Sequence, residues 1–177
     1  DEYKGLAGSD EQSYRYFMNT HLFHKININH ANTYVPNGTE PDAEKACQAY
    51  NELLHKIGPA DIQILGLGHD GHIGFNEPAE VFVKQTHCVS LSEKTIQANQ
   101  RFFESKEQVP KQAYTMGIGT IMSARKILII ISGEDKAEAV KKSFGEEISP
   151  HVPASILQLH HDVTVIADKA ASKEAII

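Results

Sequence analysis

A short apolar run followed by closely spaced glycines constrains this chain more than any other stretch. The run, residues 62–67, has the length of a buried strand. Glycines lie at position 66, near the end of the run, and at positions 68, 71 and 74 after it, and glycine permits positive φ and close approach of the backbone to other groups. Set among them are three groups able to move protons, Asp70, His72 and Glu77. Because ligands of open α/β sheets bind beyond the carboxyl ends of strands, the stretch predicts the floor of an active site.

The same glycines fit a dinucleotide-binding fingerprint, G-x-G-x-x-G, over residues 66–71. That fingerprint requires a helix that opens at the third glycine and carries the phosphate at its N-terminus. Gly74 and Pro78 fall where this helix would run, and both residue types oppose helix interiors. The pattern therefore favours an active-site loop over a dinucleotide site.

Apolar stretches alternate with helical patterns along the rest of the chain. Predicted strands cover residues 62–67, 86–91, 114–118, 126–132 and 163–167. Predicted helices cover residues 11–26, 39–57, 92–104, 120–124, 153–159, a segment that follows 133–136 and ends near 144, and the stretch from 169 onward. Such alternation implies a parallel sheet with both faces covered. We expect residues 1–177 to form a single α/β domain, with a three-layer, mostly parallel Rossmann-like sheet and helices on both faces.

Composition argues against several classes of partner. The net charge of −6 and the lack of a basic cluster speak against nucleic acid and anionic membranes. No apolar run approaches the roughly 20 residues needed to span a bilayer. The two cysteines, Cys47 and Cys88, are expected to be free thiols in a reducing compartment. We therefore predict a cytoplasmic protein and leave a homo-oligomer open.

Two motifs together resemble one enzyme family. Residues 66–78 match Gly-x-Gly-x-Asp-Gly-His-Ile-Gly-Phe-Asn-Glu-Pro, which resembles the core signature of glucosamine-6-phosphate deaminases. Residues 1–6, Asp-Glu-Tyr-Lys-Gly-Leu, resemble a second segment of those enzymes. The related 6-phosphogluconolactonases share Asp-Gly-His but lack Phe-Asn-Glu-Pro, so Glu77 separates the two groups. The match corresponds to the later two-thirds or so of a typical member, and we expect the preceding βα units, with their phosphate loop, to be missing.

The resemblance implies catalytic roles for four residues. His72 would open the sugar ring, because an unperturbed pKa of about 6.5 lets an imidazole accept and return protons near neutral pH. Asp70 and Glu77 would assist it, since nearby carboxylates favour a charged imidazole. Asp1 would carry the proton from C2 to C1 of the sugar. A solvated chain end is the competing interpretation of Asp1, because chain ends tend to fray.

The resemblance also implies a site for the sugar phosphate. Arg101, in Asn-x-Arg-Phe-Phe, offers a planar fork to phosphate oxygens, and Lys136, after the apolar strand at 126–132, offers a point charge. We expect Lys136 near a helix N-terminus, where an anion is also favoured. No metal is expected, because His69-x-x-His72 and His160-His161 lack the H-E-x-x-H pattern. The resemblance implies no organic cofactor. His87 stands where regulated family members carry an arginine, which speaks against allosteric control.

Three hypotheses follow. The leading one is a deaminase that converts glucosamine 6-phosphate and water to fructose 6-phosphate and ammonia, a hydrolase acting on a C–N bond. The second is a 6-phosphogluconolactonase-type hydrolase. The third is a non-catalytic sugar-phosphate-binding domain or an inactive fragment, an expectation that rests on the late start of the match at Asp1.

Overall fold

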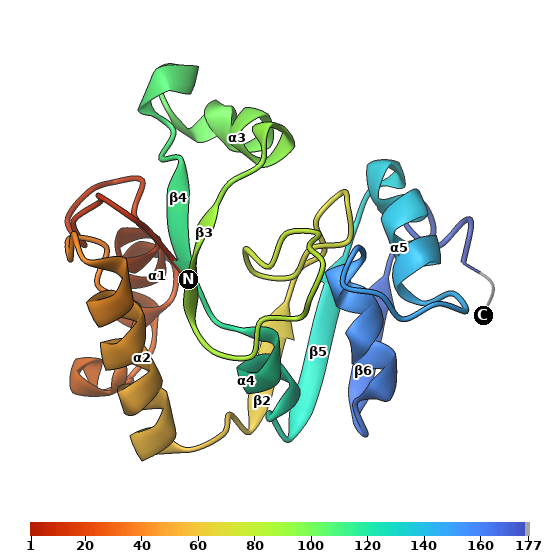
Figure 1. The fold of residues 1–177 in the computed structure, drawn as a ribbon, viewed down its shortest axis with the longest axis horizontal. Helices are drawn as coiled ribbons and strands as arrows, with labels where there is room; N and C mark the ends of the chain where they lie inside the picture. The colour runs from red at the N-terminus through yellow and green to blue at the C-terminus, as the bar shows by residue number, and fades with distance from the viewer. Residues whose placement is uncertain (176–177) are drawn as a thin grey trace. The chain divides into compact units, whose positions relative to one another are not determined.

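The computed structural model describes residues 1–175, which group into two compact units. One unit contains Asp1–Leu53 and Thr86–Thr115, and the other contains Leu54–Gln85 and the chain from Met116 onward. Figure 1 shows the helices and strands of both units. The expected single domain spanning residues 1–177 stays a prediction.

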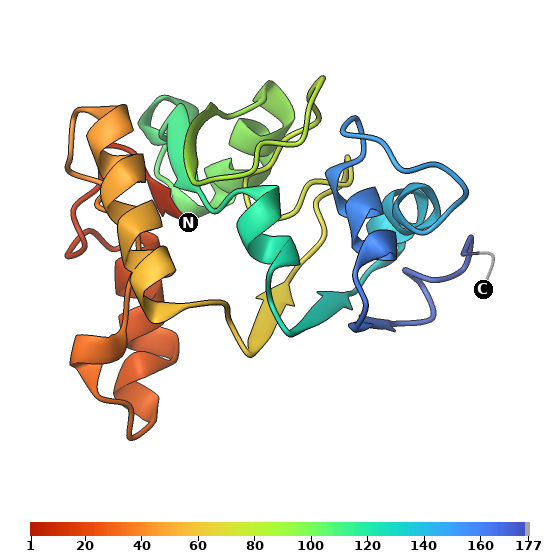
Figure 2. The same ribbon diagram turned by 60° about the horizontal axis from the view of Figure 1, so that its bottom comes forward.

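The second unit is built on a parallel sheet of three strands in the order β2-β5-β6. These strands are β2 (Ile62–Leu65), β5 (Lys126–Ile131) and β6 (Val163–Ala167). The helices α4 (Ile118–Met122) and α5 (Ala137–Ser143) and the 3₁₀ helix η6 (Pro153–Leu159) lie on one side of the strands (Figure 2). An α/β fold with a parallel sheet, predicted from the alternation of patterns, is confirmed.

The two faces of this parallel sheet differ in burial. Ile127, Ile129 and Ile131 are at most 3% exposed and form the core together with residues of α4, α5 and η6. On the opposite face, aliphatic side chains are 50–63% exposed, namely those of Ile62, Ile64, Ile130 and Ile166. Parallel strands ordinarily carry helices on both faces. Within residues 1–175, the expected second layer of helices does not cover this face.

The first unit is built on an antiparallel sheet in the order β1-β4-β3. Its strands are β1 (Glu2–Tyr3), β4 (Gln112–Thr115) and β3 (His87–Ser90), accompanied by α1 (Tyr14–His21), α2 (Ala43–Ile57) and α3 (Glu93–Asn99). Tyr114 in the middle strand is fully buried and packs with Ala46 and Cys47 of α2. The sequence pattern predicted strands here but not their antiparallel pairing, because alternation indicates a strand without naming its partner.

Helix α1 begins at Tyr14, three residues later than the start of the predicted segment 11–26. Ser13 caps its N-terminus, and the side-chain oxygen of Ser13 accepts a hydrogen bond of 3.0 Å from the N–H of Tyr16. Glu2, from the neighbouring strand, accepts the N–H groups of Tyr14 and Arg15, each at 3.0 Å. Glu2 is only 1% exposed, and its burial raises the pKa of its carboxyl despite these hydrogen bonds. A distant carboxylate therefore satisfies N–H groups that the helix itself leaves open.

The last elements of the chain were predicted with mixed success. The bounds of η6 and β6 match the predicted segments 153–159 and 163–167. Residues 169–174, by contrast, form turns where a terminal helix was predicted.

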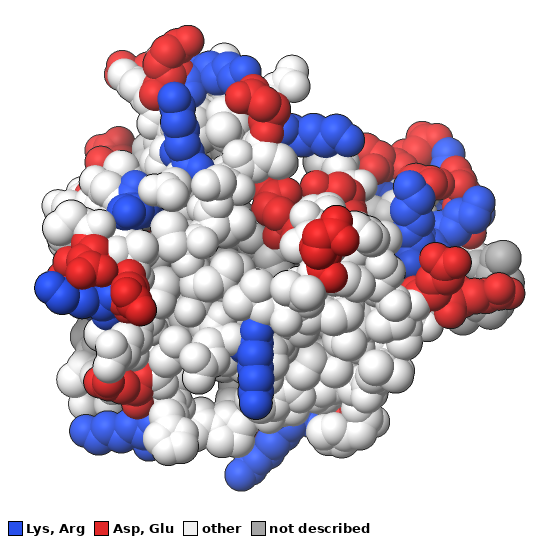
Figure 3. All heavy atoms as spheres, viewed as in Figure 1, with Lys and Arg blue, Asp and Glu red and all other residues white. Residues whose placement is uncertain are grey.

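The surface and the thiols agree with the composition. Basic side chains are interspersed with acidic ones on the face shown in Figure 3. Cys47 and Cys88 are both free. No helix within residues 1–175 combines the length and the apolar character that crossing a membrane requires.

Candidate active site

The glycine-rich loop that follows β2 folds back tightly at the carboxyl end of that strand. Gly71 and Gly74 have φ angles of 86° and 59°, a region that glycine adopts without steric cost. The N–H of Gly68 donates to the carbonyl of His72 at 2.9 Å, and the N–H of Gly71 donates to the carbonyl of Gly68 at 3.1 Å. Residues 71–80 contain no helix, so the dinucleotide fingerprint lacks the element it requires.

Gly68 has a different reason to be glycine. A Cβ atom at this position would overlap the imidazole of His72, whereas a Cβ atom at Gly66 would meet no other group within 4 Å. The imidazole therefore lies directly against the backbone at position 68. Any larger residue there would displace the ring.

His72 and Asp70 form a hydrogen-bonded pair at the tip of this loop. Asp70 Oδ1 lies 2.7 Å from His72 Nδ1 and also accepts the backbone N–H of His72 at 3.2 Å. Both side chains are 21% exposed. Burial pushes the pKa of the Asp70 carboxyl upward, but hydrogen bonds from His72 and its charge outweigh burial and lower that pKa to about 2.

This pair fixes which nitrogen of the imidazole can act on a ligand. An ionised carboxylate can only accept hydrogen bonds, so His72 Nδ1 carries a proton toward Asp70. In the neutral ring the other nitrogen, Nε2, then holds the basic lone pair. The ring is thereby oriented for proton transfer through Nε2.

Glu77 completes a cluster with this pair. One ligand atom of Glu77, one of Asp70 and one of His72 all lie within 4.8 Å of one another. Two acids and an imidazole at this separation can move protons to and from one small ligand. The same donor set could also hold a metal ion, so the expectation of a metal-free site stays a prediction.

Lys136 lies at the same end of the parallel sheet. It is the last residue of the 3₁₀ helix η5 (Glu134–Lys136), immediately before α5. Its Nζ donates to the carbonyl of Leu67 at 2.8 Å, and Leu67 leads from β2 into the loop. The predicted place of Lys136 beside the start of a helix is confirmed, and its contact with a phosphate stays a prediction.

Asp1 and Arg101 belong to the first unit. Asp1 Oδ1 accepts a hydrogen bond of 2.9 Å from the hydroxyl of Thr115, which is fully buried in β4. This contact ties Asp1 to the sheet, in contrast to the frayed end considered from the sequence. Arg101, in the 3₁₀ helix η3 (Gln100–Phe102), is exposed, with its guanidinium carbon 4.7 Å from the centre of the Phe102 ring.

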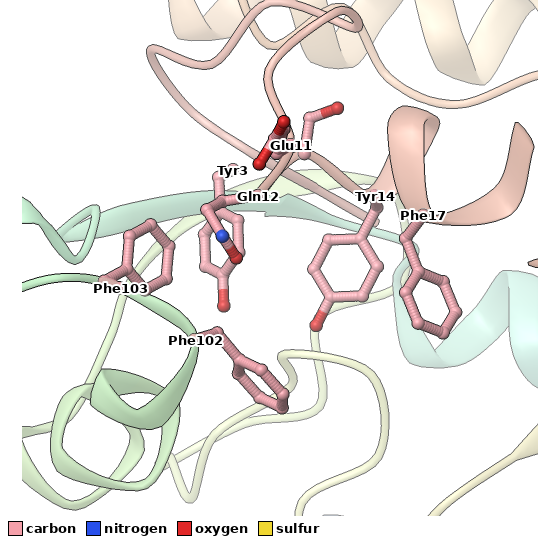
Figure 4. A pocket seen from close by; sticks show the side chains of 8 residues that line it. Tyr3, Glu11, Gln12, Tyr14, Phe17, Phe102 and Phe103 are labelled. Atoms are coloured by element: carbon pink, nitrogen blue, oxygen red, sulfur yellow. The ribbon is translucent and has the colours of Figure 1, made fainter. Parts of the chain in front are cut away.

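A hollow of about 250 Å³ in the first unit adjoins the segments that carry these two residues (Figure 4). Its walls are mostly aromatic: Tyr3 lies 5.4 Å from Tyr14 and 5.9 Å from Phe103 between ring centres, and Phe17 and Phe102 also line it. The residues that line the hollow include no lysine or arginine. The hollow therefore does not suit a phosphate group.

Sequence reasoning missed two residues that hold predicted site residues in place. Asn76, 5% exposed, donates from its side chain to the carbonyls of Ile73 at 3.0 Å and Met116 at 2.9 Å, which fixes the loop before Glu77. Thr115 holds the carboxylate of Asp1. Asn76 could have been noticed as part of the Phe-Asn-Glu-Pro motif. Thr115 carries no local signal, because its partner is 114 residues away.

Comparison with known proteins decides the relationship of the chain. Residues 5–166 match the family of glucosamine-6-phosphate isomerases and 6-phosphogluconolactonase. The chain belongs to this family. The resemblance inferred from residues 66–78 is thereby confirmed.

Two relatives illustrate how similar its members are. A glucosamine-6-phosphate deaminase of Clostridium perfringens (strain 13 / Type A) is 53% identical over 173 residues, which cover 98% of this chain and 72% of the relative. A glucosamine-6-phosphate deaminase of Lachnoclostridium phytofermentans is 55% identical over 166 residues, which cover 94% of this chain and 70% of the relative.

Solved structures agree with this assignment. A monomeric glucosamine-6-phosphate deaminase superposes with a TM-score of 0.95 at 48% identity, covering 98% of this chain and 72% of that structure. The 6-phosphogluconolactonase from Leishmania guyanensis superposes with a TM-score of 0.71 at 20% identity, covering 99% of this chain and 73% of that structure. The second comparison shows a shared fold alone.

Proposed function

We propose that this chain converts glucosamine 6-phosphate and water to fructose 6-phosphate and ammonia, as a hydrolase acting on a C–N bond. The observation that carries the proposal is the Asp70–His72 pair with Glu77 within 4.8 Å, at the carboxyl end of β2. Phe75-Asn-Glu-Pro78 and the deaminases among its relatives favour deamination over lactone hydrolysis.

His72 catalyses the opening of the sugar ring. Its Nε2 accepts the proton of the sugar O1 and returns a proton to O5, while Asp70 holds Nδ1–H and keeps the ring oriented. Glu77, whose carboxylate belongs to the same cluster, stabilises the positive charge that the imidazole gains when it is protonated.

Asp1 transfers the proton from C2 to C1 of the sugar. A carboxylate can remove a proton at one carbon and deliver it to the next without leaving its place. The hydrogen bond from Thr115 fixes one oxygen of this carboxylate, and proton transfer needs such fixed geometry. We propose that Arg101 and Lys136 bind the phosphate, Arg101 through its planar fork and Lys136 through its charge.

A coupled assay that detects fructose 6-phosphate and ammonia tests the proposal. We expect both products from the wild-type chain, with no requirement for an added cofactor. His72→Gln and Glu77→Gln are each expected to lower kcat by about a hundredfold or more, the range in which general acid–base groups act. Circular dichroism of both variants should match the wild type.

Two outcomes would replace the proposal with its alternatives. Hydrolysis of 6-phosphogluconolactone without release of ammonia would establish the lactonase. Calorimetric binding of glucosamine 6-phosphate without turnover would establish a non-catalytic binding domain. A cytoplasmic location and the lack of allosteric control remain predictions from the sequence, and a homo-oligomer remains open.

A further inference from the structure

Beside the acid–base cluster, a second histidine connects the loop to the helix that follows β5. His69 Nε2 lies 2.6 Å from Asp135 Oδ2, although the two residues are 66 positions apart. The other ring nitrogen of His69, Nδ1, lies 3.4 Å from Nζ of Lys136. Neither His69 nor Asp135 is needed for the chemistry derived above.

The groups that face the two ring nitrogens of His69 fix which nitrogen carries the proton. The hydrogen bond with His69 lowers the pKa of the Asp135 carboxyl, so Asp135 is ionised and accepts a proton from Nε2 of His69. In the neutral ring the lone pair then resides on Nδ1, which faces the ammonium of Lys136. Because an ammonium can only donate, Lys136 and His69 are complementary in this tautomer.

Lys136 is therefore held by acceptors from two residues of the loop. Its ammonium donates to the carbonyl of Leu67 at 2.8 Å and lies at the long end of hydrogen-bond range from His69 Nδ1. A lysine side chain is flexible and loses considerable rotamer freedom when it is fixed on a ligand. A lysine side chain that is already fixed in the free protein loses less rotamer freedom when it binds the ligand.

We propose that His69 and Asp135 are positioning residues that aim the ammonium of Lys136 at the phosphate of the substrate. This inference rests on the proposed function, in which Lys136 binds that phosphate. His69 and Asp135 do not touch the reacting carbon atoms. Their effect is on substrate affinity through Lys136, and not on the chemical step.

Kinetics of His69→Ala test this inference. We expect the KM for glucosamine 6-phosphate to rise about threefold to tenfold, because ordering one long side chain changes binding by about that factor. The kcat should stay within about twofold of wild type, because an interaction that is equally strong in the ground state and the transition state affects KM alone. His69→Asn keeps an acceptor near the position of Nδ1 and should restore much of the lost affinity. His151→Ala is the matched control, because His151 is another exposed histidine of this unit, 4.0 Å from Glu80.

A double-mutant cycle separates aiming from general structural support. In a Lys136→Met background, His69→Ala should change KM no further, because the side chain that it aims is gone. An equal rise in KM in that background, or an unchanged KM in His69→Ala alone, would overturn the inference.

Titration with inorganic phosphate keeps this test independent of turnover. The wild-type chain should bind phosphate more tightly than His69→Ala and as tightly as His151→Ala, even if no deamination is detected. Absence of turnover would refute the proposed function alone. Equal phosphate affinity of the wild type and His69→Ala would refute the positioning role alone.

Discussion

Replacing Asp70 by asparagine removes the negative charge that lies against the imidazole of His72 while keeping the size of the side chain. An ordinary aspartate has a pKa of 3.8, and Asp70 in the fold has a pKa of about 2. At about 1.4 kcal/mol for each pKa unit, this difference corresponds to about 2 kcal/mol of folding stability at pH 7. Asp70→Asn should lower the free energy of unfolding by about that amount.

The pH dependence of this effect has a definite sign. Because the folded pKa of Asp70 is depressed, its contribution is fully present above the unfolded pKa and is lost as the pH falls toward the folded pKa. The difference between wild type and Asp70→Asn should therefore shrink from about 2 kcal/mol at pH 7 to about 1 kcal/mol at pH 3.

Urea denaturation at both pH values measures this difference. Glu80→Gln serves as the control, because the side chain of Glu80 is 91% exposed and its nearest ion-pair partner lies at 4.0 Å, so its removal should matter little. A difference between wild type and Asp70→Asn that is absent at pH 7, or that grows as the pH falls, would refute the electrostatic account. Asp70→Asn should also lower kcat, because an amide can donate to Nδ1 and stabilise the wrong tautomer of His72.

Three further predictions follow from the geometry. Gly68→Ala should lower kcat by about a hundredfold, since displacement of a catalytic group by about 1 Å has that cost. Gly66→Ala, whose Cβ meets nothing within 4 Å, should retain activity. Equal kcat values of these two variants in stopped assays would contradict this prediction. Glu2→Gln should lower the free energy of unfolding by about 1–3 kcal/mol in urea denaturation, because one amide oxygen cannot replace both carboxylate oxygens that accept N–H groups at the start of α1; an unchanged midpoint would show that these hydrogen bonds do not matter. Treatment with a chelator followed by desalting should leave kcat unchanged, and a loss of activity that a divalent ion restores would show that the Asp70 cluster holds a metal.

The parts of the structure that could be predicted are those set by residues close to one another along the chain. The run 126–132 is apolar enough to be a central strand, and β5 occupies residues 126–131 of it. The glycines at 68, 71 and 74 predicted a loop that brings Asp70, His72 and Glu77 together, and one ligand atom of each lies within 4.8 Å of the other two. Here the spacing along the chain is itself the spatial constraint.

Contacts between distant residues could not be predicted in the same way. Glu2 reaches the start of α1, Thr115 holds Asp1, and Asp135 meets His69, over separations of 12 to 114 residues. Neither periodicity nor capping rules carry information about such pairs, because they depend on how the strands are paired. The same reason explains why strand β3 and the second half of β4 were recognised but their antiparallel sheet was not.

The aliphatic face presented by Ile62, Ile64, Ile130 and Ile166 determines how this chain must be handled in the laboratory. Attraction between such surfaces is not screened by salt, and sulfate or phosphate salts strengthen it. A concentrated stock in phosphate buffer would therefore favour self-association, which light scattering across a dilution series would reveal. Kinetic constants are best compared at matched low protein concentration, so that a change in KM reports on the sugar phosphate and not on clustering of the enzyme.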